Sequence, residues 1–320
     1  MTNTMTMLII CTVVITIIGF LEILMIQEVS VVFKSSKFQL SGGMLVFLGA
    51  LFWSLNSPLV KFIELDAMLV CGLRSLIAAA ALSAFIRPKQ LNWNIWMLVY
   101  VCSYAALCTC VILALKMTSA PIAIGMQYTA TIWLFLVSVI QTKKFNMRAF
   151  IPVCIIFTGV VFFMCSGTDA TSSTGNLIAL AEGVIFAVMT VSSKKAAGTN
   201  VIGMTAIANI FTGLVVSLIF PASMGQIGQM TGQDWIIMVI LGVIQVGGGY
   251  CFYNMGVQKV SAQKASVISL WEMILGPIWV ALFLQEYPSI PVLIGFVIIL
   301  AGMLLDAKLN TVSETTSEVS

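Results

Sequence analysis

The stretch SGGMLVFLGALFWSLNSPLVKF, residues 41–62, decides the class of fold, because Lys61, near its end, is its only charged residue. A helix needs about 20 predominantly apolar residues to cross the hydrocarbon core of a bilayer. The whole chain has a similar composition: 60% of its 320 residues are hydrophobic, 8% are charged, and the mean hydropathy is +1.08. Soluble domains carry about 25% charged residues. We therefore expect an all-α polytopic membrane protein.

Apolar runs of similar length follow along the chain, separated by short polar links. The predicted spans are 42–62, 67–86, 95–115, 119–141, 149–166, 175–193, 200–221, 235–257, 262–285 and 289–306. This pattern predicts ten transmembrane helices, preceded by an N-terminal hydrophobic extension (1–40) and followed by a disordered polar tail (308–320). Residues 7–26, which contain Glu22, are either an eleventh span or upstream sequence translated from a misplaced start. Both interpretations fit the sequence.

The basic residues test this arrangement of spans. If the first span, 42–62, starts in the cytoplasm, the outer side receives only Lys61 and Lys116. The cytoplasmic side receives Lys34, Lys37, Arg87, Lys89, Lys143, Lys144, Arg148, Lys194, Lys195, Lys259, Lys264 and Lys308. Cytoplasmic loops are enriched in Lys and Arg. We therefore expect a multi-pass protein of the bacterial plasma membrane, with both ends of the 41–307 core cytoplasmic.

An internal match indicates two copies of one five-span unit. Residues 41–62 can be laid over TGNLIALAEGVIFAVMTVSSKK (174–195), and later SAPIA (119–123) falls on SAQKA (261–265). We expect a first repeat at 41–166 and a second at 174–307. Because five is an odd number, the second copy is inverted relative to the first. Inverted repeats are typical of secondary transporters, whose substrate site lies near the bilayer midplane.

Three segments resemble the EamA family of the drug/metabolite transporter superfamily: ALFWSLNSPLVK (50–61), ALKMTSAPIAIGMQYTATIW (114–133) and LWEMILGPIWVALFLQE (270–286). The resemblance covers roughly residues 41–307. It implies two inverted five-helix repeats and the export or exchange of a small metabolite, amino acid-like or drug-like, by alternating access. It also implies a central cavity lined by the first, third, fourth, sixth, eighth and ninth spans. Thr131 stands where the family has proline.

Glu272 is the only charged residue between Lys264 and Glu286. A charged side chain at the bilayer centre costs at least about 2.5–3.5 kcal/mol, and ionisable residues at that depth are often functional. Gly276 and Pro277, on the same span, favour a helix bend. Glu272 either faces the cavity and binds a proton or a cationic group, or it is protonated and donates a hydrogen bond to a neighbouring helix.

Two further charges lie at membrane depth. Arg74 lies in the outer half of its span and is expected to reach the interface with its long side chain. It is interpreted as a structural or gating charge. Glu182, in the middle of the sixth span, is a second candidate proton or charge site. A pairing of Arg74 with Glu182 or Glu272 is compatible with the sequence.

Polar and aromatic side chains within apolar runs complete the predicted cavity. Asn56 lies close to Pro58, a second candidate helix bend, and the motifs MQYTAT (126–131) and GGGYCFYN (247–254) add amides and phenols. Hydrogen bonding between helices would use the same residue types. The predicted cavity residues are Trp53, Asn56, Gln127, Tyr128, Tyr250, Asn254, Trp271 and Glu272.

The residue inventory argues against catalysis. The chain has no histidine, and its eight cysteines show no metal-ligand spacing, so we expect no metal, no cofactor and no enzymatic activity. The expected partners are a small-molecule substrate and the lipid bilayer, and not nucleic acid. The alternatives are a membrane-embedded enzyme acting on a lipid-linked substrate and a structural subunit of a larger complex.

Overall fold

The computed structural model describes residues 40–143, 145–166, 170–196, 200–260 and 262–318, and all regular structure within these ranges is helical. The longer helices are α2 (Gly42–Ser54), α3 (Asn56–Phe62), α4 (Ala67–Leu82), α5 (Ile95–Met117), α6 (Ala120–Gln127), α7 (Ala130–Thr142), α8 (Met147–Ser166), α9 (Ala170–Ala196), α10 (Val201–Ile219), α12 (Gly232–Val239), the π-helix η4 (Ile240–Gly248), α13 (Gly249–Val257), α14 (Ala262–Leu284) and α15 (Ile290–Glu318). Short turns complete the set: η1 (Ser83–Phe85), η2 (Pro88–Gln90), α11 (Pro221–Met224) and η3 (Gly225–Gln229).

Eight helical segments in the described ranges are long and apolar enough to cross a membrane, and two shorter apolar helices follow them. The eight are Gly42–Phe62, Ala67–Phe85, Ile95–Met117, Ala120–Val137, Met147–Met164, Ser173–Ser193, Val201–Ile219 and Gly232–Val257, and the shorter two are Ile268–Leu284 and Ile290–Asp306. The protein is therefore a polytopic membrane protein. Each segment overlaps one predicted span, while the count of ten membrane crossings stays a prediction.

Polar side chains mark where several of these helices begin. The Ser41 hydroxyl accepts a hydrogen bond from the Met44 N–H group at the start of α2, and Asn94 caps α5 in the same way. Asp66 caps α4, Asn200 caps α10, and Thr231 forms a capping box at α12. The first N–H groups of a helix have no partner within it, so these caps satisfy donors at the ends of apolar segments.

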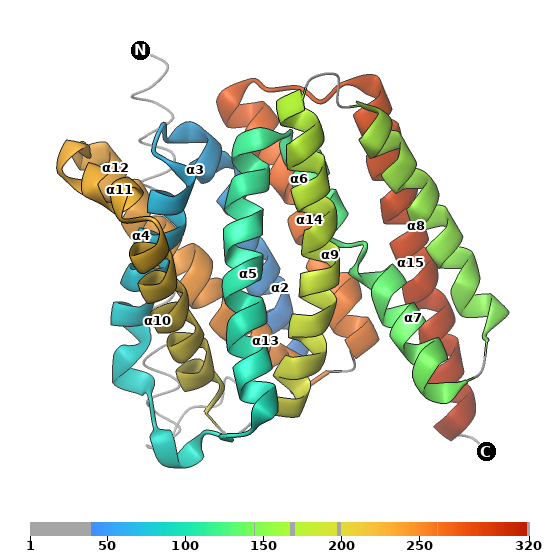
Figure 1. Ribbon diagram of the computed structural model, residues 1–320. Coiled ribbons are helices and arrows are strands. Elements are labelled where there is room, and N and C mark those ends of the chain that lie inside the picture. Colours follow the sequence, from blue (N-terminus) through green and yellow to red (C-terminus); the bar gives the residue numbers. More distant parts are fainter. Residues whose placement is uncertain (1–39, 144, 167–169, 197–199, 261, 319–320) are drawn as a thin grey trace.

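The helices pack in pairs that join distant parts of the chain. In Figure 1, α5 and α9 run side by side across the front of the bundle, α8 and α15 lie together at one side, and α4 and α10 lie at the other. Behind the front pair, α2 packs against both α13 and α14, and α6 packs against α9. The interior between these pairs is the buried core of the protein.

The ends of the chain differ from expectation or lie outside the described residues. The predicted extension 1–40 lies outside them apart from Leu40. The predicted disordered tail, 308–320, is helical as far as Glu318, because α15 continues without a break from its apolar part. Extending an existing helix adds one hydrogen bond per residue without a new nucleation step, which composition alone does not reveal.

Candidate functional site

A cavity of about 20 Å³ lies in the core where three helical segments are interrupted or irregular. Six of its lining residues were singled out in the sequence: Trp53, Asn56, Arg74, Gln127, Tyr250 and Glu272. Cys108, Val111, Phe186 and Gln245 complete the lining. About 10–15 Å³ is the minimum for one water molecule, so this conformation has room for about one water and not for a metabolite.

The first interruption separates α2 from α3. Pro58 has no N–H group to donate to the carbonyl of Ser54, four residues earlier, and its ring crowds that carbonyl. The helix accordingly ends at Ser54, and α3 begins at Asn56. The Ser54 hydroxyl accepts a hydrogen bond from the Trp279 indole N–H group over 3.1 Å, which ties α14 to the interruption. Asn56 is thereby presented to the core.

The second interruption separates α6 from α7 without a proline. Between them, backbone bonds run three residues back, from Tyr128 to Gly125 and from Thr129 to Met126. The Thr129 hydroxyl also donates to the Met126 carbonyl over 2.7 Å. Such side-chain bonds compete with regular helical bonds. Gln127 therefore lies at the end of a helix within the core.

The third irregularity is the π-helix η4, which holds Gln245 between α12 and α13. A π-helix is a rare widening of the helix and occurs frequently at functional sites. Gln245 is 4% exposed and faces Arg74. It is the only polar side chain between Trp235 and Gly249. That isolation was the signal by which the sequence could have revealed it.

Arg74 is held in the interior and does not reach the interface, so that part of the prediction is wrong. Its side chain is 2% exposed. Nη1 donates to Asn56 Oδ1 over 2.8 Å and to Gln245 Oε1 over 3.3 Å, while Nη2 donates to the Cys108 carbonyl over 3.2 Å. A buried cation keeps its charge only where such dipoles replace its hydration shell.

Arg74 pairs with neither glutamate. Among the described residues one ion pair within 4.0 Å is found, between Lys61 and Glu286. Arg74 and Glu272 line the same cavity without forming a salt bridge. The cavity therefore presents a guanidinium and a carboxyl group that do not satisfy each other.

Glu272 lies on α14 and is 8% exposed. The Tyr128 hydroxyl lies 3.0 Å from Glu272 Oε2 and 2.8 Å from the Ser269 carbonyl oxygen. A phenol has one proton to donate. Tyr128 can serve both neighbours only if it donates to Ser269 and accepts a hydrogen bond from a protonated Glu272.

Glu182 lies on α9 and does not line the cavity, although Phe186, one turn further along, does. Its side chain is 1% exposed, and neither carboxylate oxygen has a hydrogen-bond partner among the described residues. The next residue, Gly183, packs so closely on Thr129 and Met126 that a Cβ atom there would overlap with the Thr129 hydroxyl. Glu182 is thus fixed close to the interruption between α6 and α7.

The aromatic residues divide between the cavity and its surroundings. Trp53 lies between Tyr250 and Tyr253, with ring centroids 4.8 and 4.5 Å away. Tyr250 also contacts Tyr104, at 4.7 Å. Trp53 and Tyr250 therefore form an aromatic wall of the cavity.

Three of the predicted cavity residues do not line the cavity: Tyr128, which lies within hydrogen-bond distance of Glu272, and also Trp271 and Asn254. Trp271 is 46% exposed and packs edge-on against Phe47, because adjacent residues on a helix point about 100° apart and Glu272 takes the inward direction. Asn254 donates to the Thr205 hydroxyl over 3.1 Å, between α13 and α10. Trp271 and Asn254 support the packing around the site.

The remaining predicted bend residues have separate roles. Pro58 lies in α3, just after the first interruption. Pro277 lies inside α14, which remains one continuous helix from Ala262 to Leu284. Gly276 provides the space into which Ile124 of α6 packs, since a Cβ atom there would come within 2.5 Å of Ile124 Cδ1.

Comparison with known proteins places this arrangement in a family. The model of the EamA-like transporter family matches residues 40–165 and 173–306, which is most of the chain. The protein belongs to the EamA-like transporter family. An uncharacterized transporter of Archaeoglobus fulgidus is 21% identical to this EamA-like protein over 267 residues, covering 81% of this chain and 94% of the relative.

Two further likenesses agree with the membership in the EamA-like family. An uncharacterized transporter of Bacillus subtilis is 25% identical over 211 residues, and the match covers 62% of this chain and 67% of the relative. A protein of known crystal structure superposes with a TM-score of 0.57 over 84% of this chain and 97% of that chain, at 17% identity. The last likeness shows the fold alone. This EamA-like protein is thus a multi-pass membrane protein of a transporter family.

Proposed function

We propose that the protein is a secondary transporter of the plasma membrane that exports or exchanges a small metabolite by alternating access around the central cavity. The carrying observation is the placement of Arg74 and Glu272 in one buried cavity without a salt bridge between them. A solute that brings both charges, such as an amino acid, would satisfy both groups at once. The aromatic wall of Trp53 and Tyr250 suits an apolar or planar body.

The pairing of helices supports two inverted repeats, 41–166 and 174–307. Under the repeat, α2 with α3 corresponds to α9, α5 to η4 with α13, and α6 with α7 to α14. If each helix is replaced by its counterpart in the other repeat, the pair α5–α9 becomes α13–α2 and the pair α6–α9 becomes α14–α2. All four of these pairs are in contact. The pairs α4–α10 and α8–α15 exchange with themselves. A pseudo-two-fold axis requires such a set of contacts. Ten spans would leave both ends of the 41–307 core on one side, and the enrichment of Lys and Arg in the links of that side supports the cytoplasm.

The interrupted helices support the position of the substrate site. Non-helical backbone at membrane depth is tolerated only where it is buried in protein or lines a cavity. The interruptions at Leu55 and Tyr128 and the π-helix η4 all surround the same cavity. Divided helices of this kind form substrate sites in other transporters, where rocking or gating of helix bundles around the site alternates access between the two sides.

Glu272 is the proposed proton or charge site. When the carboxyl group carries a proton, it can donate to the Tyr128 hydroxyl while Tyr128 donates to the Ser269 carbonyl oxygen. Release of that proton would leave two acceptors competing for one phenol proton, and a cationic group of the solute would relieve the competition. Solute binding and proton release are thereby linked. Glu182 is proposed as a second, auxiliary charge site because both of its oxygens are buried without a partner among the residues described.

The test compares metabolites in the medium of bacteria that produce the wild-type protein, the Glu272→Gln variant, the Glu64→Gln variant or an empty vector, at two external pH values. Glu64 is an exposed loop carboxylate, so its variant makes the same chemical change away from the cavity. We expect one solute class to accumulate with wild type and Glu64→Gln and to decrease with Glu272→Gln. Equal metabolite concentrations in the media of wild-type and empty-vector cells, across a broad panel of metabolites, would refute export. Equal behaviour of Glu272→Gln and wild type at both pH values would refute the role of the carboxyl group.

A further inference from the structure

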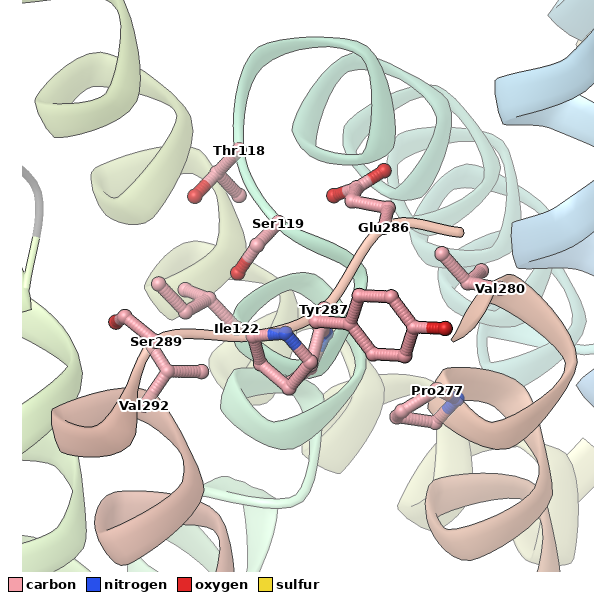
Figure 2. Close-up of a pocket in the computed structure, with 11 residues that line it drawn as sticks. Thr118, Ser119, Ile122, Pro277, Val280, Glu286, Tyr287, Ser289 and Val292 are labelled. Atoms are coloured by element: carbon pink, nitrogen blue, oxygen red, sulfur yellow. The ribbon is translucent and has the colours of Figure 1, made fainter. Parts of the chain in front are cut away.

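The described part of the chain contains a hollow that is larger than the central cavity. A pocket of about 140 Å³ lies between the link that joins α5 to α6 and the link that joins α14 to α15. Figure 2 shows Glu286 and Tyr287 on one link facing Thr118 and Ser119 on the other, with Pro277 of α14 below them. In the proposed orientation, both links lie on the outer side of the membrane, so we refer to this as the outer pocket.

The outer pocket combines one carboxylate with apolar walls. Its polar end carries Glu286, while Ile122, Pro277, Val280 and Val292 supply the apolar lining. The Glu286 side chain is 41% exposed. Lys61 engages it through Oε1, at 3.0 Å, and Lys61 itself is absent from the pocket lining. The carboxylate therefore serves both a lysine at the rim and the pocket.

The outer pocket and the central cavity lie one above the other between the same two helices. Ile122 and Pro277 line the outer pocket, while Gln127 and Glu272 line the central cavity, on α6 and α14 respectively. On each helix the two residues are five positions apart, Ile122 and Gln127 on α6 and Glu272 and Pro277 on α14, which is about 7.5 Å along the helix axis. Between the two levels, Ile124 packs into the space left by Gly276. A solute on its way between the outer side and the central cavity meets the outer pocket first or last.

We propose that the outer pocket is a second binding site, for a small solute with an ammonium group beside an apolar body, and that the solute displaces Lys61 from Glu286. The inference rests on the proposed transport function for its role, since the solute bound there would be the one waiting to enter or leave. A cavity of about 150 Å³ accommodates a benzene molecule, so the pocket suits a body of that size. The ammonium group replaces the lysine ammonium at the same carboxylate, which makes Lys61 a competitor.

The test measures equilibrium binding to the full-length protein in lipid nanodiscs, without any gradient, so that it is independent of transport. The probes are benzylammonium, benzyl alcohol as its neutral counterpart and benzoate as its anionic counterpart. Ligand-observed NMR detects the bound fraction, and empty nanodiscs correct for partition into lipid. We expect benzylammonium to bind about tenfold more tightly than benzyl alcohol, the usual gain for a hydrogen bond to a charged group. Benzoate is expected to bind least.

Four variants distinguish the outer pocket from the central cavity. Glu286→Gln is expected to weaken benzylammonium binding about tenfold, and Ser289→Trp, at an exposed lining position, to block the pocket for both benzylammonium and benzyl alcohol. Lys61→Met is expected to tighten benzylammonium binding, because it removes the competitor; a merely structural role for the ion pair would not produce tighter binding. Glu64→Gln, which removes an exposed carboxylate outside both linings, is expected to leave benzylammonium binding unchanged.

Three outcomes would overturn the proposal. Benzylammonium binding that is lost in Glu272→Gln but kept in Glu286→Gln would place the probe in the central cavity. Equal binding of benzylammonium and benzyl alcohol would show an apolar pocket without a preference for a cation. Absence of binding by all three probes would leave no site of this kind, whereas a failure of the export experiment alone would leave this binding result standing.

Discussion

Asn56 and Arg74 join the first interrupted helix to α4: the guanidinium Nη1 donates to the Asn56 amide oxygen over 2.8 Å, and both side chains are buried. The amide is presented only because α2 ends at Ser54. A buried guanidinium that loses an acceptor keeps its charge but loses part of its solvation. The relationship links the local conformation of the backbone to the electrostatics of the cavity.

Replacing Asn56 by alanine is therefore expected to destabilise the protein. Arg74 would keep its weaker contacts to Gln245 and Cys108, and hydrogen bonds to charged groups contribute about 1.5–3 kcal/mol. Thermal unfolding in detergent measures the loss. Asn92→Ala is the matched control, since Asn92 is exposed in the link before α5. An unchanged unfolding temperature for Asn56→Ala would contradict the role of the amide.

Restoring the backbone donor at position 58 is expected to join α2 and α3. In Pro58→Ala, the new N–H group can donate a hydrogen bond to the Ser54 carbonyl. The helix is expected to gain about 1 kcal/mol of stability. This gain is smaller than the full penalty for proline inside a helix, because Pro58 lies in the first turn of α3. We expect unchanged or higher thermal stability together with slower transport. Pro221→Ala is the control, since Pro221 opens α11, where proline is well tolerated. Transport at the wild-type rate in Pro58→Ala would show that the interruption is dispensable.

Close approach of α2 and α13 depends on Gly256. A Cβ atom at this position would lie 2.8 Å from the Val46 backbone nitrogen and 2.9 Å from the Gly42 carbonyl oxygen. Backbone atoms cannot rotate away, so Gly256→Ala is expected to separate the helices and to cost about 1–3 kcal/mol. Gly228→Ala is the matched control, because nothing lies within 4 Å of its Cβ position. Equal unfolding temperatures for the two variants would refute the close approach.

The cap of α4 is expected to weaken in acid. Burial opposes ionisation of Asp66, but hydrogen bonds from the Ser223 hydroxyl and from the Leu69 and Met68 N–H groups outweigh it and lower the pKa of Asp66 below 3.8. A lowered folded-state pKa contributes stability that is complete above the unfolded pKa and is lost as the pH falls through the folded pKa. The stability advantage of wild type over Asp66→Ala is therefore expected to be about 0.5–2 kcal/mol at neutral pH and to decrease as the pH falls below about 4.

Unfolding of both proteins between pH 7 and pH 3 checks this prediction. The difference in stability must shrink on the acid side and stay constant on the neutral side. A difference that remains constant down to pH 3 would show that the protonated side chain caps the helix equally well.

The positions of the helices followed from the length of the apolar runs, and the interruption at Leu55 from Pro58. The interruption at Tyr128 did not, because its determinants are the Thr129 hydroxyl and the packing of Gly183 from α9. Single-chain patterns report on a residue and its neighbours along the helix. They do not report which distant helix packs against it.

The same limit divides the candidate site. Asn56, Arg74 and Glu272 stand out as polar groups in apolar runs, and all three line one cavity. Their partners could not be read in the same way: Arg74 was expected near the interface, yet Gln245 and the Cys108 carbonyl hold it inside. Trp271 was placed in the cavity by its proximity to Glu272, although the helical rotation between them directs it outward.

The small volume of the central cavity limits the passage of protons across the membrane in this conformation. Protons cross membranes along continuous files of hydrogen-bonded water, and an apolar constriction that excludes water interrupts such a file. With room for about one water beside Glu272, and with Ile124 packed on Gly276 above it, this conformation offers no such file through the residues described. Under the proposed function, a carrier that rests in this conformation would offer protons no path through these residues, and the membrane potential would be maintained.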